Sequence, residues 1–193
     1  MSAFSASEAE RTAAAQLPEG DVVAILLEQH ARIRDLFARL SRVTGEDRQR
    51  AFDELRALLA VHEAAEELIV RPVAKKTAGA DEADARNSEE KEASEVLRKL
   101  ESMDVAGPEF QAVLAEFERA VGDHAEHEER EEFPAIVAQC TTDQRRTMGA
   151  RLRKAEHLAP PHPHPTAAGS PAALALTGPF AAMMDKARDA IGR

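Results

Sequence analysis

The chain has 193 residues and a formal net charge of -10 at pH 7, is rich in Ala, Leu, Glu and Arg, and contains neither Trp nor Tyr. With few β-branched runs, this composition predicts an all-α protein, and the length suits one domain with an appended tail. The negative charge disfavours nucleic acid and anionic membranes as partners, because like charges repel, and it favours cation binding.

Three further features bear on the compartment. The single cysteine, Cys140, has no partner for an internal disulfide. Residues 1–16 lack the apolar segment of a signal peptide, and nowhere do eighteen or more apolar residues run together, so no segment is expected to cross a bilayer. We therefore expect a soluble, cytoplasmic protein.

Residues 1–20 read as a polar leader, and residues 21–139 carry four apolar stripes. Within each stripe, apolar side chains recur at spacings of three and four, as in a helix with one face in a core. Breaks at residues 41–48, 75–81 and 104–108 separate the stripes, and Pro72 predicts a kink or an early end of the second helix. The pattern predicts an antiparallel up-down four-helix bundle.

Additional C-terminal helices follow the predicted bundle. Residues 140–158 read as a short basic helix, whose charges we interpret as a solvated face rather than an anion site. Residues 159–178 are Pro-rich and predict an extended, mobile linker. Residues 179–193 carry an amphipathic stripe that includes Phe180, Met183 and Met184, which we expect to dock on the bundle; a partner-binding helix is the alternative.

Histidine or glutamate interrupts each of the four stripes where a core needs apolar side chains. Burying such groups without partners costs on the order of 2 kcal/mol for an imidazole and more for a carboxylate. Counted from the turns, they lie at matching depths, roughly 20 Å along each helix, so an antiparallel bundle brings them into one layer. The residues are His30, His62, Glu66, Glu90, His124 and Glu128.

Part of this set belongs to an internal repeat, since HEAAEELIVRP at residues 62–72 returns as HAEHEEREEFP at 124–134. A separation of four residues places His and Glu on one helical face. His127 and Glu131 share that spacing, but Pro134 lies ten residues after His124, as Pro72 does after His62. We therefore choose His124 and Glu128 and expect His127 to be a neighbour of the site or exposed. Glu63, Glu67 and Glu129 are assigned to the solvated face, with a supporting role at the site as the alternative.

Imidazole and carboxylate together suit iron, manganese or zinc, and bridging carboxylates inside a four-helix bundle build di-iron and di-manganese sites. Two ions fit this number of ligands better than one. The competing interpretation, that each residue is a hydrogen-bonded core side chain, suits one residue better than six at one level.

At these residues the chain resembles the haemerythrin-like, or HHE cation-binding, family, whose pattern is His, His-x-x-x-Glu, His, His-x-x-x-Glu on four helices. The resemblance covers about residues 21–139, with Glu90 standing where the family has a third-helix histidine. A shift of one residue would place Lys91 there instead, pointing away from the core. The resemblance implies a non-haem di-iron centre that engages O2, NO or peroxide, with a redox partner or a homo-oligomer as further expectations.

Three functions remain open at this level. The first is a di-iron redox protein, in which the extra carboxylate of Glu90 favours oxidation chemistry, such as turnover of peroxide or ferrous iron, over reversible O2 carriage. The second is an iron buffer or donor without turnover. The third is a protein-interaction module with a structural metal. No Gly-rich phosphate loop is present, and Cys140 lacks an activating partner in the sequence, so other catalytic classes have no support.

Overall fold

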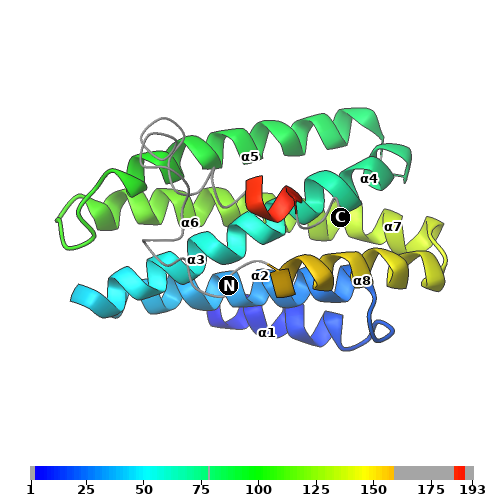
Figure 1. The fold of residues 1–193 in the computed structure, drawn as a ribbon, viewed down its shortest axis with the longest axis horizontal. Coiled ribbons are helices and arrows are strands. Elements are labelled where there is room, and N and C mark those ends of the chain that lie inside the picture. Colours follow the sequence, from blue (N-terminus) through cyan, green and yellow to red (C-terminus); the bar gives the residue numbers. More distant parts are fainter. Residues whose placement is uncertain (1–2, 78, 159–184, 190–193) are drawn as a thin grey trace.

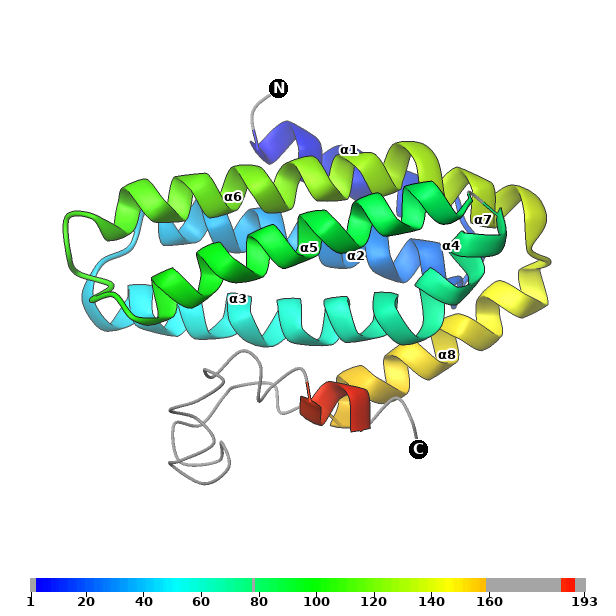
Figure 2. The same cartoon turned by 90° about the horizontal axis from the view of Figure 1, so that it is seen from above.

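The computed structural model describes residues 3–77, 79–158 and 185–189 (Figure 1). The described residues form helices and turns and include no strand. Four long antiparallel rods make a bundle, with further helices outside it (Figures 1 and 2). The predicted all-α, up-down four-helix bundle with additional helices is therefore confirmed. None of the described helices is long and apolar enough to cross a membrane.

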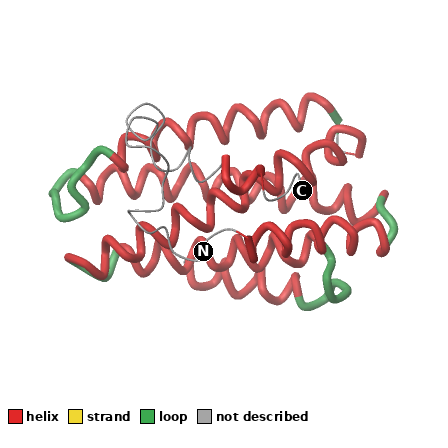
Figure 3. Tube along the Cα trace, viewed as in Figure 1, coloured by secondary structure: helices red, strands yellow, loops and turns green. Residues whose placement is uncertain are grey.

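The first rod is α2 (Val22–Leu40), and the third is α5 (Ala80–Glu101). The second rod runs from α3 (Gly45–Ala65) through the π-helical turn η1 (Glu66–Val70) into α4 (Arg71–Thr77). The fourth is built in the same way, from α6 (Phe110–His127) through η2 (Glu128–Glu132) into α7 (Phe133–Gln139). Figure 3 shows how few loop residues connect these rods.

Two of the expected connections are shorter than the sequence predicted. The segment 45–48 belongs to α3, because Glu46 and Asp47 place negative charge in its first turn, where the helix dipole favours it. The segment 75–77 is still helical, because the chain reverses at Gly79, whose φ of 117° suits glycine. Pro72 does not end the second rod, because the chain continues as α4 from Arg71 to Thr77 after the π-helical turn η1.

The predicted apolar stripes are buried between the rods. Two edge-to-face aromatic pairs connect helices of the bundle. Phe37 of α2 contacts Phe117 of α6 at 5.5 Å between ring centroids, and Phe52 of α3 contacts Phe110 of α6 at 5.4 Å. Burying each such side chain stabilises the fold by about 1.5–3 kcal/mol. This apolar packing fixes the depth at which the polar residues of the stripes meet.

Helix α1 (Ala3–Ala14) lies within the segment that the sequence suggested only as a polar leader. It packs along α2 (Figure 1). There Arg34 donates to the buried Glu10 at 2.5 Å, and Arg11 pairs with Asp35. Helix α1 was not predicted, because its stability comes from these tertiary contacts rather than from a clear apolar stripe.

Helix α8 (Thr142–Leu158) matches the predicted basic helix, but its basic residues do not all form a solvated face. Arg151, Arg153 and Lys154 are exposed, whereas Arg145 is buried and donates to Asp21 at 2.6 Å. Asp21 also caps the start of α2, so this ion pair ties α8 to the first rod.

The structure describes only part of the predicted C-terminal amphipathic helix. Residues 185–189 are helical (Figure 2). Ala187 is buried in the core, and Arg188 pairs with Glu67 at 2.7 Å. This short part therefore packs on the bundle as expected. The predicted linker at 159–178 and the rest of the helix, with Phe180, Met183 and Met184, lie outside the described residues.

Candidate metal centre

The two copies of the repeat share an unusual backbone feature. The N–H of Arg71 donates to the carbonyl of Glu66, and the N–H of Phe133 donates to the carbonyl of Glu128, five residues back in each case. A proline follows each of these donors. Proline has no N–H and its ring crowds the carbonyl four residues earlier, so a wider π turn accommodates it inside a continuous helix.

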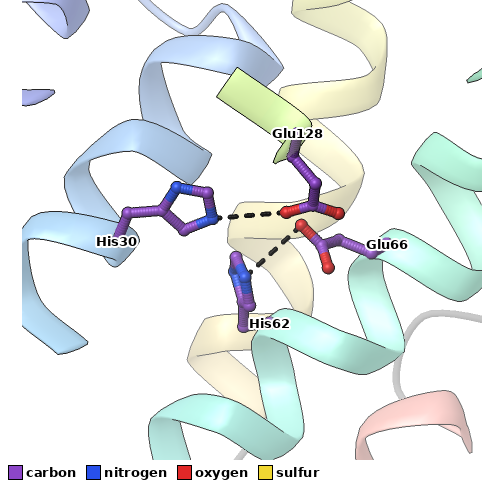
Figure 4. Close-up of side chains that lie close together, drawn as sticks. All are labelled: His30, His62, Glu66 and Glu128. Atoms are coloured by element: carbon purple, nitrogen blue, oxygen red, sulfur yellow. Dashed lines mark ion pairs between the residues drawn. The ribbon is translucent and has the colours of Figure 1, made fainter. Parts of the chain in front are cut away.

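All six predicted side chains lie together in the bundle core, from the four rods. They form two overlapping groups, and within each group one donor atom from every residue lies within 4.8 Å of the others. We call the first group the first position; it contains His30, His62, Glu66 and Glu128 (Figure 4). The second position contains Glu66, Glu90, His124 and Glu128. Glu66 and Glu128 belong to both.

The donor atoms face one another at distances longer than hydrogen bonds. Nε2 of His30 lies 3.5 Å from Oε2 of Glu128, and Nε2 of His62 lies 3.3 Å from Oε1 of Glu66 (Figure 4). Nε2 of His124 lies 3.3 Å from Oε1 of Glu128. Ligand atoms about 2.1 Å from a shared ion are separated by roughly 3 Å, so this spacing fits coordination to a metal ion.

Several of these atoms have no hydrogen-bond partner within the described part of the chain. They are Nε2 of His30, Nε2 of His124, both carboxylate oxygens of Glu66 and Oε2 of Glu128, all buried. Leaving one buried polar atom unpaired costs about 1–3 kcal/mol. A cation between them would satisfy the whole set at once, so the residues present fit a metal site.

The other nitrogen of each histidine is held by a neighbouring side chain. Nδ1 of His30 donates to Glu129 at 2.7 Å, and Nδ1 of His124 donates to Glu89 at 3.0 Å. Each ring is thereby oriented with Nε2 toward the cluster. Outer partners of this kind are typical of metal-bound histidines, because they fix the tautomer and the ring plane.

The third histidine, His62, uses an amide instead of a carboxylate. Its Nδ1 donates to Oε1 of Gln29 at 2.8 Å, while Nε2 of Gln29 donates to Glu156 of α8 at 2.7 Å. Because a carboxylate only accepts, Glu156 fixes which end of the Gln29 amide faces the imidazole. Helix α8 is thus linked to the cluster through two hydrogen bonds.

Burial and the neighbouring charges shift the pKa values of the cluster residues in different directions. Burial opposes the imidazolium form of His30, but the nearby carboxylates of Glu128 and Glu129 outweigh it and raise the pKa of His30 to about 9. Burial and the nearby His30 hold the pKa of His62 well below its usual range, so that imidazole is neutral. Although burial acts the other way, His124 holds the pKa of Glu128 well below its usual range. Protons and metal ions compete for these same atoms.

Two residues that the sequence analysis did not single out reach the cluster from the π turns. Arg71 is buried and pairs with Glu90, with Glu128 at 3.4 Å and with Glu132 at 2.7 Å. Phe133 stacks on the ring of His30, with 5.5 Å between centroids and 22° between planes.

The structure places some of the remaining predicted neighbours at the cluster and others on the surface. Glu129 is not on a solvated face, since it bonds to His30, and half-buried Glu63 lines a cavity beside the cluster. Glu67 is exposed, as expected. His127 lies 2.9 Å from Glu89, one step removed from His124, in agreement with its expected place as a neighbour. The adjacency of Glu129 to Glu128 was the available sequence signal for its role.

A small cavity adjoins the cluster on the side away from the π turns. It offers about 40 Å³ to the centre of a water-sized molecule, room for a diatomic molecule or a few waters. Its polar lining comes from the cluster residues His30, His62, His124 and Glu90 and from the neighbouring Arg34, Glu63 and Glu118. The opposite wall is apolar and includes Ile33, Phe37, Leu59 and Val121.

A helical bundle whose core holds buried imidazoles and shared carboxylates defines a metal-binding four-helix protein. Residues 21–136 match the family described as the Hemerythrin HHE cation binding domain, which spans more than half of the chain, so the chain belongs to this family. The family membership confirms the resemblance found in the sequence and implies a bound metal cation.

Two relatives illustrate the likeness. An uncharacterized hemerythrin-like protein of Schizosaccharomyces pombe is 28% identical over 134 residues, which cover 68% of this chain and 66% of the yeast protein. A crystal structure of a hemerythrin HHE cation binding domain-containing protein from Mycobacterium kansasii superposes with a TM-score of 0.68. It is 21% identical and covers 86% of this chain and 98% of that chain, which shows the shared fold.

Proposed function

We propose that this protein is a non-haem iron protein that holds two ions in the bundle core and reacts there with O2, NO or peroxide. The observation that carries the proposal is the orientation of the three histidines. Each has Nδ1 bonded to an outer partner and Nε2 turned toward shared, buried carboxylates. Such an arrangement prepares nitrogen donors for metal ions before any ion binds.

In this proposal the carboxylates of Glu66 and Glu128 would help to hold both ions, because each belongs to both groups. His30 and His62 complete the first position, and Glu90 and His124 complete the second. Bound iron would supply the redox chemistry, whereas manganese or zinc would fit the same donor atoms. The protein side chains hold the ions, exclude bulk water and orient the imidazoles.

The cavity supports a small ligand. Its size suits a diatomic molecule or a peroxide, and its apolar wall favours weakly polar species over ions. The histidines of both positions line it, so a molecule in the cavity would lie beside both ions. A cytoplasmic location, where such species and iron are available, is part of the same proposal.

The test is metal analysis of the full chain purified without added metal, combined with absorption spectra before and after peroxide. We expect about two irons per chain and a near-ultraviolet band that changes with peroxide. His124→Gln should lose metal, whereas His127→Gln, a matched control with a glutamate at the same spacing, should retain it. Absence of iron from both the parent chain and the control would overturn the proposal. A single stoichiometric reaction without turnover would instead identify an iron buffer.

A further inference from the structure

Arg71 and Phe133 occupy the same place in the repeat. Each lies nine residues after its histidine and directly before its proline, and each is the donor that closes a π turn. The turn brings both side chains onto the cluster, but with different chemistry. Phe133 places an apolar ring against His30, and Arg71 places a cation against Glu90. The two halves of the site are therefore unequal.

The contacts of Arg71 belong to the second position. Its Nη2 pairs with Glu90 and lies 3.4 Å from Oε1 of Glu128, while Nη1 donates to Glu132 at 2.7 Å. Only 5% of the Arg71 side chain is exposed. Glu90 and Glu128 are both members of the second position, and Glu128, like Glu66, also belongs to the first. The guanidinium thus lies beside the atoms that a second ion would use.

The guanidinium keeps its charge under all ordinary conditions. A buried cation repels a divalent ion at a neighbouring site more strongly than it would in water, because screening is weak there. In addition, Glu90 already pairs with Arg71, so it must share or leave that partner to bind an ion. In the first position no guanidinium pairs with the two histidines, whose Nδ1 atoms bond to Glu129 and Gln29.

We propose that Arg71 makes the two metal positions unequal, so that the first position binds an ion tightly and the second binds one weakly. This inference rests on the proposed function in one respect, because it requires the cluster to bind metal. It also changes the expected electrostatic effect of Glu90. The extra carboxylate, which stands where the family pattern has a histidine, is offset by the positive charge of Arg71 rather than added to the net charge of the centre.

The test is titration of the chelator-treated full chain with Mn²⁺, followed by electron paramagnetic resonance and calorimetry. We expect two separate steps, the second at least about tenfold weaker than the first, as a nearby unit charge implies. Arg71→Gln should strengthen the second step at least about tenfold and leave the first within about threefold. Arg71→Lys, which retains the charge, should keep two separate steps.

Two further variants keep the outcome interpretable. In the single variant Arg71→Gln, Glu132 loses its partner Arg71. The double variant Arg71→Gln with Glu132→Gln removes that carboxylate as well, and circular dichroism checks that both variants fold. Arg130→Gln removes one positive charge from the exposed face of the other π turn, η2, and should leave both steps unchanged. Equal steps in the parent chain, or an unchanged second step in both Arg71→Gln variants, would overturn the inference. Failure of the parent chain to bind any Mn²⁺ or iron would instead overturn the proposed function.

Discussion

Gly149→Ala tests whether helix α8 is seated as the structure shows. Gly149 faces the loop before α2, and a Cβ built on it would lie 2.1 Å from the carbonyl oxygen of Gly20 and 3.0 Å from Cδ1 of Ile25. A backbone oxygen cannot rotate away, so α8 must shift by about 1 Å to relieve the overlap. The substitution adds one methyl group and lies outside the metal cluster, so its main effect is this steric overlap.

The expected loss of stability follows from two opposing effects. Overpacking of a close contact costs about 1–3 kcal/mol, and the overlap with backbone places this case at the upper end. Alanine recovers up to about 1 kcal/mol through its higher helix propensity. The net destabilisation of about 2 kcal/mol should lower the Tm by roughly 4–8 °C for a chain of this size.

Thermal unfolding followed by circular dichroism measures this change, with Arg151→Ala on the exposed face of α8 as the control. A Tm of Gly149→Ala equal to or above that of the parent would show that α8 does not press on Gly20. The shift should also disturb the bond from Gln29 to Glu156 and so loosen His62. We expect zinc binding at the first position to weaken by about tenfold, the usual effect of losing an outer partner.

Three further predictions concern the centre itself. Gln29→Leu removes the acceptor for Nδ1 of His62. It should weaken the first zinc-binding step by about 10- to 100-fold while the circular dichroism spectrum remains unchanged. Because the pKa of His30 is raised to about 9, an ion binding at lower pH must displace its proton. Zinc affinity should therefore increase with pH and level off near pH 9, with proton release detected by calorimetry in buffers of different ionisation heat; pH-independent binding would contradict this. Gly122→Leu should fill the cavity and slow the reaction with peroxide or NO in stopped-flow experiments at unchanged iron content, and Gly122→Ala serves as its control.

The sequence was sufficient to predict that the six candidate donor residues lie together, because two simple periodicities apply to them. All six lie on regular helices or at the start of a π turn, so the four-residue spacing and the matched depths hold. Arg71 was not predicted to lie at the cluster because the π turn changes the helical rotation before it. In an unbroken α-helix, nine residues turn the chain by roughly 900°, which would place Arg71 on the side opposite His62. The extra residue in the turn brings it back to the cluster.

The outer partners escaped for a different reason. Gln29 and Glu89 each lie one residue before a candidate donor. Nothing in the helical period selects them over other polar residues nearby. Their roles depend on contacts between distant segments, such as Gln29 with Glu156, 127 residues apart, and Arg145 with Asp21, 124 residues apart. Helix α1 likewise owes its place to Glu10 and Arg34 rather than to its own periodicity.

Helices α1 and α8 both lie outside residues 21–136, which match the family, and both pack on α2. Thirteen of the nineteen residues of α2 are buried, as expected for a helix covered on nearly all sides. From α1, Glu10 brings a carboxylate within 4.8 Å of donor atoms of His30 and Glu129, and from α8, Glu156 orients Gln29. The candidate metal donors thus lie at positions of the family pattern, with Glu90 in place of a histidine, whereas some of the groups that set their orientation and protonation come from the added helices. Since such groups tune metal affinity and reactivity, members of this family with the same donors but different flanking helices should differ in both.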